Sequence, residues 1–206
     1  MSGAAAAAPV LAVLAIGIVS PGPSFLVVAR TAVAVSRTAA VACAFGMAAA
    51  AVLLATAPLA GLTALFEQLP TAYLVLKIAG SGYLLYLAAA TWANAGAPIR
   101  VDSLAPVASG SVLRFMVSGA GTMLGNPKAA VQYGVIFSAM LPPSQAPWAT
   151  LLAGIFLLEV SWYTFVAFVL SAPGTRRVYM RAKRPADQVV AAVLGGLGLR
   201  LLPWSG

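Results

Sequence analysis

Two ionisable residues stand in parts of the sequence that are otherwise apolar. Lys128 directly follows Asn126-Pro127, and Glu159 lies in the middle of a hydrophobic run over residues 148–171. A charge at the centre of a bilayer costs about 3 kcal/mol or more, so such a residue normally faces the interior of a helical bundle and has a partner there. We therefore predict that Lys128 and Glu159 face each other inside the protein.

These two charges have two interpretations, and the residues alone leave both open. In the first, Lys128 binds the carboxylate of a small substrate, while Glu159 binds its amino group or takes up a coupling proton. In the second, the two side chains form a permanent ion pair that only fixes the packing of the helices. Aromatic residues of the same spans are weaker candidates for the lining of a cavity, because aromatics inside helices more often serve packing: Tyr83, Tyr86, Trp162 and Tyr163.

Two clusters of helix-breaking residues fall at corresponding places in the two halves of the chain. The first is Ser20-Pro21-Gly22-Pro23, and the second is Gly125-Asn126-Pro127-Lys128. Proline removes a backbone donor and clashes with the preceding turn, so each cluster is expected to split its helix into two half-helices. In the second cluster, Asn126 is predicted to cap the half-helix that follows the break, with Pro127 at its first position. In the first cluster, Pro23 is predicted to begin the half-helix that follows the break.

Breaks in a helix at membrane depth expose backbone groups that lipid cannot satisfy. They are tolerated where protein buries them or where they line a polar cavity. Two breaks at matching positions therefore predict a binding site, toward which the positive N-terminal ends of half-helices point. The alternative is that each proline only kinks a packed helix.

The composition indicates an integral membrane protein. Of the 206 residues, 62% are hydrophobic and only 8% are charged, with a mean hydropathy of +0.97, whereas soluble domains carry about 25% charged residues. About 20 apolar residues are enough for a helix to cross a bilayer. The apolar stretches predict six transmembrane helices, over residues 5–35, 38–65, 71–93, 111–141, 148–171 and 186–203.

These spans predict an all-α fold with a single transmembrane domain, residues 1–206. Residues 1–103 and 104–206 are expected to form two pseudo-repeats of three helices, with the first and fourth helices broken at mid-membrane. Because each repeat contains an odd number of spans, the two repeats insert in opposite orientations and form a 3+3 inverted repeat.

The basic residues alternate between the predicted loops. The loops after the first, third and fifth spans, together with the span ends beside them, carry Arg30, Arg37, Arg100, Arg114, Arg176, Arg177, Arg181, Lys183 and Arg184. The loops around residues 67–70 and 142–147 contain no Lys or Arg. By the positive-inside rule, the basic loops lie in the cytoplasm and both termini lie outside it.

The residue types also exclude several kinds of site. Histidine is absent and Cys43 is the only cysteine, so zinc sites built on these residues and internal disulfides are excluded. The basic residues form short clusters between apolar segments, which does not suit nucleic acid. We expect no cofactor, no metal and no enzymatic activity. The expected partners are a small-molecule substrate and the lipid bilayer, and the small glycine-rich faces permit a homodimer without requiring one.

Several motifs together resemble the LysE/RhtB family of amino-acid and homoserine/threonine exporters. Their order and placement on the spans carry the resemblance, which covers nearly the whole chain. They are Ser20-Pro21-Gly22-Pro23-Ser24, the stretch from Leu76 to Leu87, Gly125-Asn126-Pro127-Lys128-Ala129-Ala130, Ser171-Ala172-Pro173 with Arg176-Arg177, and the stretch from Gly195 to Leu201.

The resemblance implies secondary-active export of amino acids or related metabolites across the bacterial inner membrane, driven by the proton gradient. It also implies that the two breaks line the pathway. Gln132-Tyr133 departs from the aromatic pair that the family usually has after Asn-Pro-Lys, so the substrate stays open. The predicted site residues are Pro21, Gly22, Pro23, Ser24, Asn126, Pro127, Lys128, Gln132, Glu159 and Trp162, with Glu159 also proposed for proton coupling.

Three other classes of protein are alternatives to an exporter of amino acids. An ion or metal exporter of the same superfamily would have few ligands in this chain. An intramembrane enzyme would need a nucleophile with a base or paired acids, and Glu159 stands alone in its span. A membrane protein with a purely structural role would not need buried charges such as Lys128 and Glu159.

Overall fold

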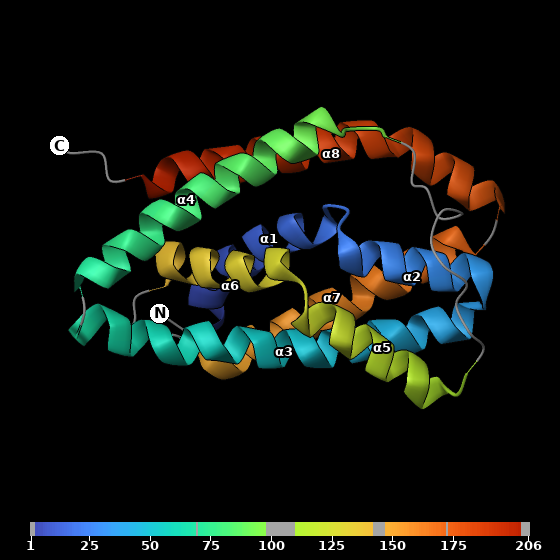
Figure 1. Ribbon diagram of the computed structural model, residues 1–206, viewed down its shortest axis with the longest axis horizontal. Coiled ribbons are helices and arrows are strands. Elements are labelled where there is room, and N and C mark those ends of the chain that lie inside the picture. The colour runs from blue at the N-terminus through green and yellow to red at the C-terminus, as the bar shows by residue number, and fades with distance from the viewer. Residues whose placement is uncertain (1–2, 69, 98–109, 142–146, 172, 203–206) are drawn as a thin grey trace.

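The computed structural model of the protein describes residues 3–68, 70–97, 110–141, 147–171 and 173–202. Within these ranges the regular structure is entirely helical (Figure 1). The helices are α1 (Gly3–Val19), α2 (Pro23–Ala34), α3 (Arg37–Gln68), α4 (Pro70–Ala93), α5 (Val112–Leu124), α6 (Pro127–Met140), α7 (Trp148–Leu170) and α8 (Pro173–Leu201). The prediction of an all-α fold is therefore confirmed for the described residues.

The first predicted span consists of two helices, α1 and α2, which are bent by 57° at the break between them. Gly22 precedes α2 in an extended conformation, and Pro23 occupies the first turn of α2. Proline fits there because the first-turn N–H groups have no partner within the helix. The local sequence thus both ends α1 and begins α2, as the proline cluster predicts.

The second break separates α5 from α6 and has a stronger cap. Asn126 Oδ1 accepts hydrogen bonds from the backbone N–H groups of Lys128, at 3.1 Å, and Ala129, at 3.4 Å, and Pro127 occupies the first turn of α6. The cap satisfies donors that the start of a helix otherwise leaves open. The N-cap prediction for Asn126 is confirmed.

Helix α3 packs mainly against α5 and α7. The buried face of α3 is built largely from alanines, and small side chains let helix backbones come close. Two glycines mark a close approach of α3 and α5: a Cβ on Gly46 of α3 would overlap the backbone carbonyl of Met116, and one on Gly119 of α5 would overlap that of Cys43. Both positions require glycine.

Helices α4 and α8 form a second unit that lies along one edge of the bundle (Figure 1). The buried hydroxyl of Ser81 on α4 donates a 2.6 Å hydrogen bond to the carbonyl of Gly198 on α8. A smaller apolar cluster, which includes Leu84, Val135 and Leu194, attaches this pair to α6.

The predicted start of the last span needs correction. We expected residues 176–184 to form a loop and the helix to begin at residue 186, but α8 begins at Pro173 and continues through Pro185. A run of charges keeps a segment out of hydrocarbon but does not end a helix, since Arg, Lys, Met and Ala are all good helix formers. Lys183 and Asp187 form an ion pair one turn apart, across Pro185, and so support the helix there.

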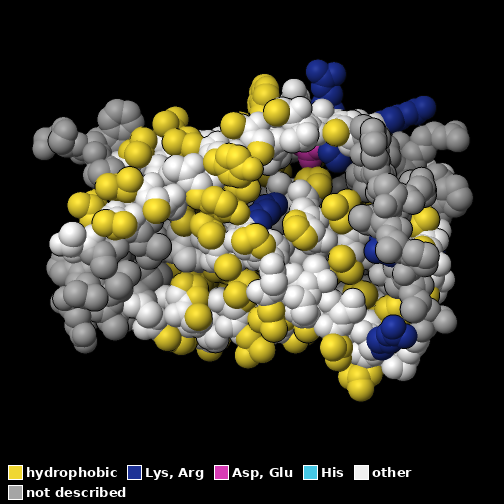
Figure 2. All heavy atoms as spheres, in the orientation of Figure 1, with side chains coloured by type: hydrophobic (Ala, Val, Ile, Leu, Met, Phe, Trp, Pro, Cys, Tyr) yellow, Lys and Arg dark blue, Asp and Glu magenta, His cyan; other side chains and the backbone are white. Residues whose placement is uncertain are grey.

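Among the described residues, two helices are long and apolar enough to cross a membrane: Arg37–Gly61 of α3, and α7. The bent pair Ala7–Val19 and Pro23–Ala34 passes the same test as one broken span. On the face in Figure 2, hydrophobic side chains are spread over most of the molecule and the basic ones gather mainly toward one end. Arg100 and the side chains of Arg176 and Arg177 lie outside what the structure describes.

Candidate functional site

The two helix breaks, which lie about half a chain length apart in sequence, touch each other in the structure. Asn126 Nδ2 donates a hydrogen bond of 2.9 Å to Ser24 Oγ, and Lys128 Nζ donates one of 2.8 Å to the carbonyl of Ser20. Ser20, Ser24 and Asn126 are all buried. The polar residues of each break therefore satisfy groups of the other, well inside the protein.

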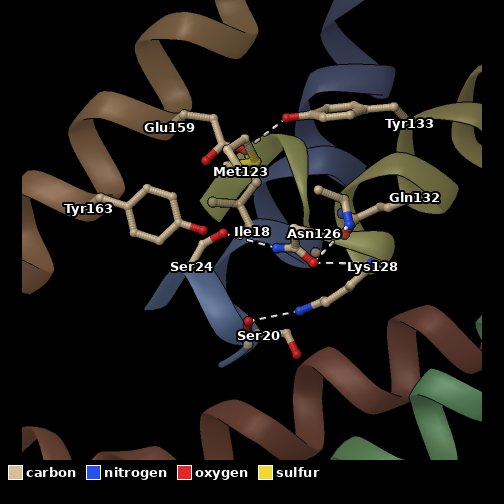
Figure 3. Close-up of a pocket in the computed structure, with 13 residues that line it drawn as sticks. Ile18, Ser20, Ser24, Met123, Asn126, Lys128, Gln132, Tyr133, Glu159 and Tyr163 are labelled. Atoms are coloured by element: carbon tan, nitrogen blue, oxygen red, sulfur yellow. Dashed lines mark hydrogen bonds between the residues drawn. The ribbon is translucent and has the colours of Figure 1, made fainter. Parts of the chain in front are cut away.

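A small inner pocket lies where the breaks meet (Figure 3). Its polar lining consists chiefly of Ser20, Ser24, Asn126, Lys128, Gln132 and Glu159, and Tyr133 and Tyr163 close it on the sides of α6 and α7. The cavity volume is about 20 Å³, which is close to the space that one water molecule needs. In this conformation the space inside the inner pocket is too small for an amino acid.

Two buried polar atoms of the inner pocket have no hydrogen-bond partner, Oε2 of Glu159 and Nε2 of Gln132. The other carboxylate oxygen of Glu159 accepts a 2.7 Å hydrogen bond from the hydroxyl of Tyr133. Glu159 is 2% exposed and Gln132 is 4% exposed. A buried polar group without a partner costs about 1–3 kcal/mol, and in native proteins such groups often mark a ligand or water site.

The shape of α1 at the inner pocket depends on a glycine. A Cβ on Gly17 would overlap the side-chain amide of Gln132. The absence of a side chain at Gly17 therefore makes the room that the Gln132 amide occupies. Gly17 is a site residue that the sequence analysis missed.

Lys128 and Glu159 line the inner pocket together without forming an ion pair. The ammonium of Lys128 donates to the Ser20 carbonyl, and the carboxylate of Glu159 accepts from Tyr133. Lys128 interacts electrostatically with two carboxylates, Glu159 and Asp187. The permanent ion pair that was one reading of the sequence is thus absent from this conformation.

A larger, more open cavity of about 440 Å³ lies on the other side of Lys128. This outer cavity lies between the breaks and the α4–α8 pair, and its lining includes Pro23, Tyr83, Asn94, Lys128, Lys183 and Asp187. Ser20, Gly22 and Lys128 line both spaces. The Lys128–Ser20 hydrogen bond therefore lies at the boundary between the inner pocket and the outer cavity.

The predicted site residues divide between these two spaces. Ser24, Asn126, Gln132 and Glu159 line the inner pocket, Pro21 and Pro23 line the outer cavity, and Gly22 and Lys128 line both. Pro127 begins α6 and lines neither. Trp162 also lines neither space. Its ring packs against Phe165, and its indole nitrogen is buried without a hydrogen-bond partner.

Sequence reasoning missed the contribution of α8. Asp187 was given no role, and Lys183 was taken for a residue of a cytoplasmic loop, yet both are buried and line the outer cavity. The signal that could have found them is their spacing of four residues, which places opposite charges on one face of a helix.

Comparison with known proteins supports one family over most of the chain. The family of LysE type translocators matches residues 15–204. An uncharacterised membrane protein of Escherichia coli K12, YahN, is 31% identical over 185 residues, which cover 89% of this chain and 82% of that protein.

Two relatives carry a functional name. The threonine efflux protein of Escherichia coli K12 is 29% identical and that of Salmonella typhi 28%, each over 191 residues that cover 91% of this chain and 92% of the relative. No solved structure matches the chain. The match to the family covers both helix breaks and every helix that lines the two cavities, and the chain belongs to the LysE type translocator family.

Proposed function

We propose that this protein exports a small zwitterionic amino acid and that the paired helix breaks bind it. The observation that carries the proposal is the inner pocket, where a carboxylate oxygen of Glu159 and an amide nitrogen of Gln132 are buried without partners beside the ammonium of Lys128. These groups are complementary to the ammonium, the polar side chain and the carboxylate of an amino acid.

Each end of the substrate has a defined partner in this proposal. Lys128 and the N-terminal end of α6 attract the carboxylate, because the ammonium and the helix dipole are both positive there. Glu159 attracts the ammonium through its free oxygen, and Gln132 is available for a polar side chain. The two relatives named as threonine efflux proteins support a small hydroxylated side chain.

The pairing of helices supports the inverted repeat that the proposal needs. If α1–α2, α3 and α4 correspond to α5–α6, α7 and α8, then the contact of α3 with α5 has its counterpart in that of α7 with α1. The contact of α2 with α7 likewise matches that of α6 with α3, and α3 contacts α7 while α4 contacts α8. We propose six spans in this arrangement, in the bacterial inner membrane, with the basic ends in the cytoplasm.

Coupling to the proton gradient is assigned to Glu159. The carboxylate has one hydrogen bond and one free oxygen, so it can hold either a proton or the ammonium of the substrate, but not both at the same oxygen. Competition of this kind links uptake of a proton to release of the substrate.

The first prediction concerns export from cells. Cells that lack the gene for this protein should accumulate one amino acid when they are loaded with the dipeptide that supplies it, and expression of the wild-type protein should remove the excess. Lys128→Met and Glu159→Gln should each reduce export at least tenfold, because each removes one partner of the zwitterion. The measurement is the intracellular amino-acid content over time, at matched protein levels in the membrane.

A matched control lies on the same helix as Glu159. Leu157 is 61% exposed on the outer face of α7, so Leu157→Ala should export at the wild-type rate. Export at the wild-type rate in both Lys128→Met and Glu159→Gln would contradict the proposed site, and accumulation of a metal ion instead of an amino acid would favour the alternative of a metal exporter.

A further inference from the structure

The outer cavity contains an ion pair that the inner pocket does not explain. Lys183 Nζ and an oxygen of Asp187 are in direct contact on α8, and the two residues are only 6% and 4% exposed. The same Asp187 oxygen also accepts a 3.4 Å hydrogen bond from the backbone N–H of Gly96, in the turn after α4. Burying a charged pair is expensive and rarely adds much stability, so its position in a cavity points to a ligand.

The size of the outer cavity suits an amino acid, whereas that of the inner pocket does not. The outer cavity measures about 440 Å³ and the inner pocket about 20 Å³. Ligand sites in proteins commonly measure about 300–1,000 Å³. Of these two spaces, the outer cavity is the one with room for a molecule the size of an amino acid in this conformation.

The chemistry of the outer cavity repeats that of the inner pocket. Each space contains a carboxylate, Asp187 in the outer cavity and Glu159 in the inner pocket, and Lys128 lines both spaces. Lys128 interacts electrostatically with each of these carboxylates. The outer cavity has a second ammonium, that of Lys183, and its apolar wall includes the tyrosine pair Tyr83 and Tyr86.

We infer that Lys183 and Asp187 form a second binding site for the zwitterionic head group of an amino acid, which loads the substrate before it reaches the inner pocket. This inference rests on the proposed function. The substrate carboxylate takes the place of Asp187 beside Lys183, and its ammonium binds Asp187. We call this second site the loading site. Because Lys183 lies in the basic segment of α8, the loading site lies on the cytoplasmic side in the proposed orientation, as an exporter requires.

The shared lysine gives the transfer between the two sites a simple route. The substrate carboxylate passes from Lys183 to Lys128, and the ammonium passes from Asp187 to Glu159. For this transfer the Lys128 ammonium must leave the Ser20 carbonyl, which opens the boundary between the outer cavity and the inner pocket. No step needs a group other than those of the two cavities.

The direct test is equilibrium binding of tritiated L-threonine to the full-length protein in lipid nanodiscs, on a Glu159→Gln background that disables the inner pocket. We expect the Glu159→Gln variant to bind threonine at one site per chain. The further change Asp187→Asn should weaken this binding at least tenfold. Arg181→Gln, which removes an exposed charge from the same helix, should change the affinity less than twofold. 3-Hydroxybutyrate and 1-amino-2-propanol, which lack one charge each, should not compete.

A charge exchange separates binding from a purely structural role. The double variant Lys183→Asp with Asp187→Lys keeps an ion pair one turn apart but reverses the positions of the charges. If the pair is only structural, the exchange should restore both the thermal stability and the threonine binding that Asp187→Asn loses. The loading site predicts that threonine binding stays at least tenfold weaker than in the parent protein, even where thermal stability is restored.

The same variants also change transport kinetics in an otherwise wild-type protein. Asp187→Asn should raise the KM for export at least tenfold while the maximal rate falls less than threefold, because it removes binding that precedes the transport step. An unchanged KM, unchanged affinity in Asp187→Asn, or full rescue by the charge exchange would overturn the loading site. A wild-type protein that neither binds nor exports any amino acid would overturn the proposed function itself, and the inference with it.

Discussion

The inner pocket lies where residues of α1, α6 and α7 come together, and it contains polar atoms without hydrogen-bond partners. Gln132 of α6 lies where Gly17 of α1 has no side chain, and Glu159 of α7 is held through one oxygen by Tyr133. The free atoms of Gln132 and Glu159 both belong to the pocket. At the scale of single residues, the polar atoms that the fold leaves without partners therefore define the proposed site.

Gly17→Val is a test at this scale. Its side chain would overlap the Gln132 amide, so Gln132 must turn away from the pocket, and we expect amino-acid export to fall at least tenfold. Overpacking costs about 1–3 kcal/mol, which should leave the protein folded. Export per molecule, measured in cells beside the thermal stability of the purified protein, checks this.

Ala12→Val is the matched control, because Ala12 lies on the same helix with its side chain exposed. It places the same valine side chain on α1 without touching Gln132. Equal export by Gly17→Val and Ala12→Val would contradict the role assigned to Gln132.

The local sequence was enough to predict one part of the site. Proline, glycine and asparagine act on their own backbone, so the breaks at Pro21–Pro23 and at Asn126-Pro127 could be placed without knowledge of the packing. Tyr133 as the partner of Glu159, and Gly17 as the neighbour of Gln132, depend on contacts between distant helices. No local pattern carries that information.

At the scale of helices, α3 and α5 come together through glycines that each face the other backbone. A Cβ on Gly119 would overlap the backbone of Cys43, whereas Gly121, two residues further along α5, has open space around it. The apolar runs predicted both helices, but composition alone could not say which of the many glycines and alanines mark the crossing. The extent of α8 was misjudged because its basic turns were taken for a loop.

This crossing yields a prediction about stability. Gly119→Leu should push α5 away from α3 and lower the free energy of unfolding by about 3 kcal/mol or more, because backbone atoms cannot move aside as a flexible side chain can. Gly121→Leu should change it by less than about 0.5 kcal/mol. Thermal unfolding of the two purified variants in the same detergent measures the difference, and equal unfolding temperatures would contradict this account of the crossing.

At the scale of the whole molecule, the basic residues and the outer cavity both lie on the cytoplasmic side in the proposed orientation. The alternation of charge predicted that side from sequence, but the cavity could not be predicted, because it depends on how far the α4–α8 pair lies from the two breaks. Figure 1 shows that pair along the edge of the bundle. A small apolar cluster lies between the pair and α6.

The orientation can be measured with single cysteines on a Cys43→Ser background. Ser111→Cys lies at a predicted cytoplasmic end and Thr71→Cys at the opposite end, and both positions are exposed. A membrane-impermeant maleimide added to spheroplasts should label Thr71→Cys at once and Ser111→Cys only after the membrane is permeabilised. The reverse pattern would contradict the positive-inside assignment.

The central claim is that the two helix breaks form the substrate site, and exchange of tritiated threonine for unlabelled threonine across proteoliposomes tests it most directly. Exchange needs no driving gradient, so it reports binding and passage without proton coupling. We predict rapid exchange by the wild-type protein and by Leu157→Ala, and exchange at the level of protein-free liposomes for Lys128→Met. Exchange by Lys128→Met at the wild-type rate would contradict the claim.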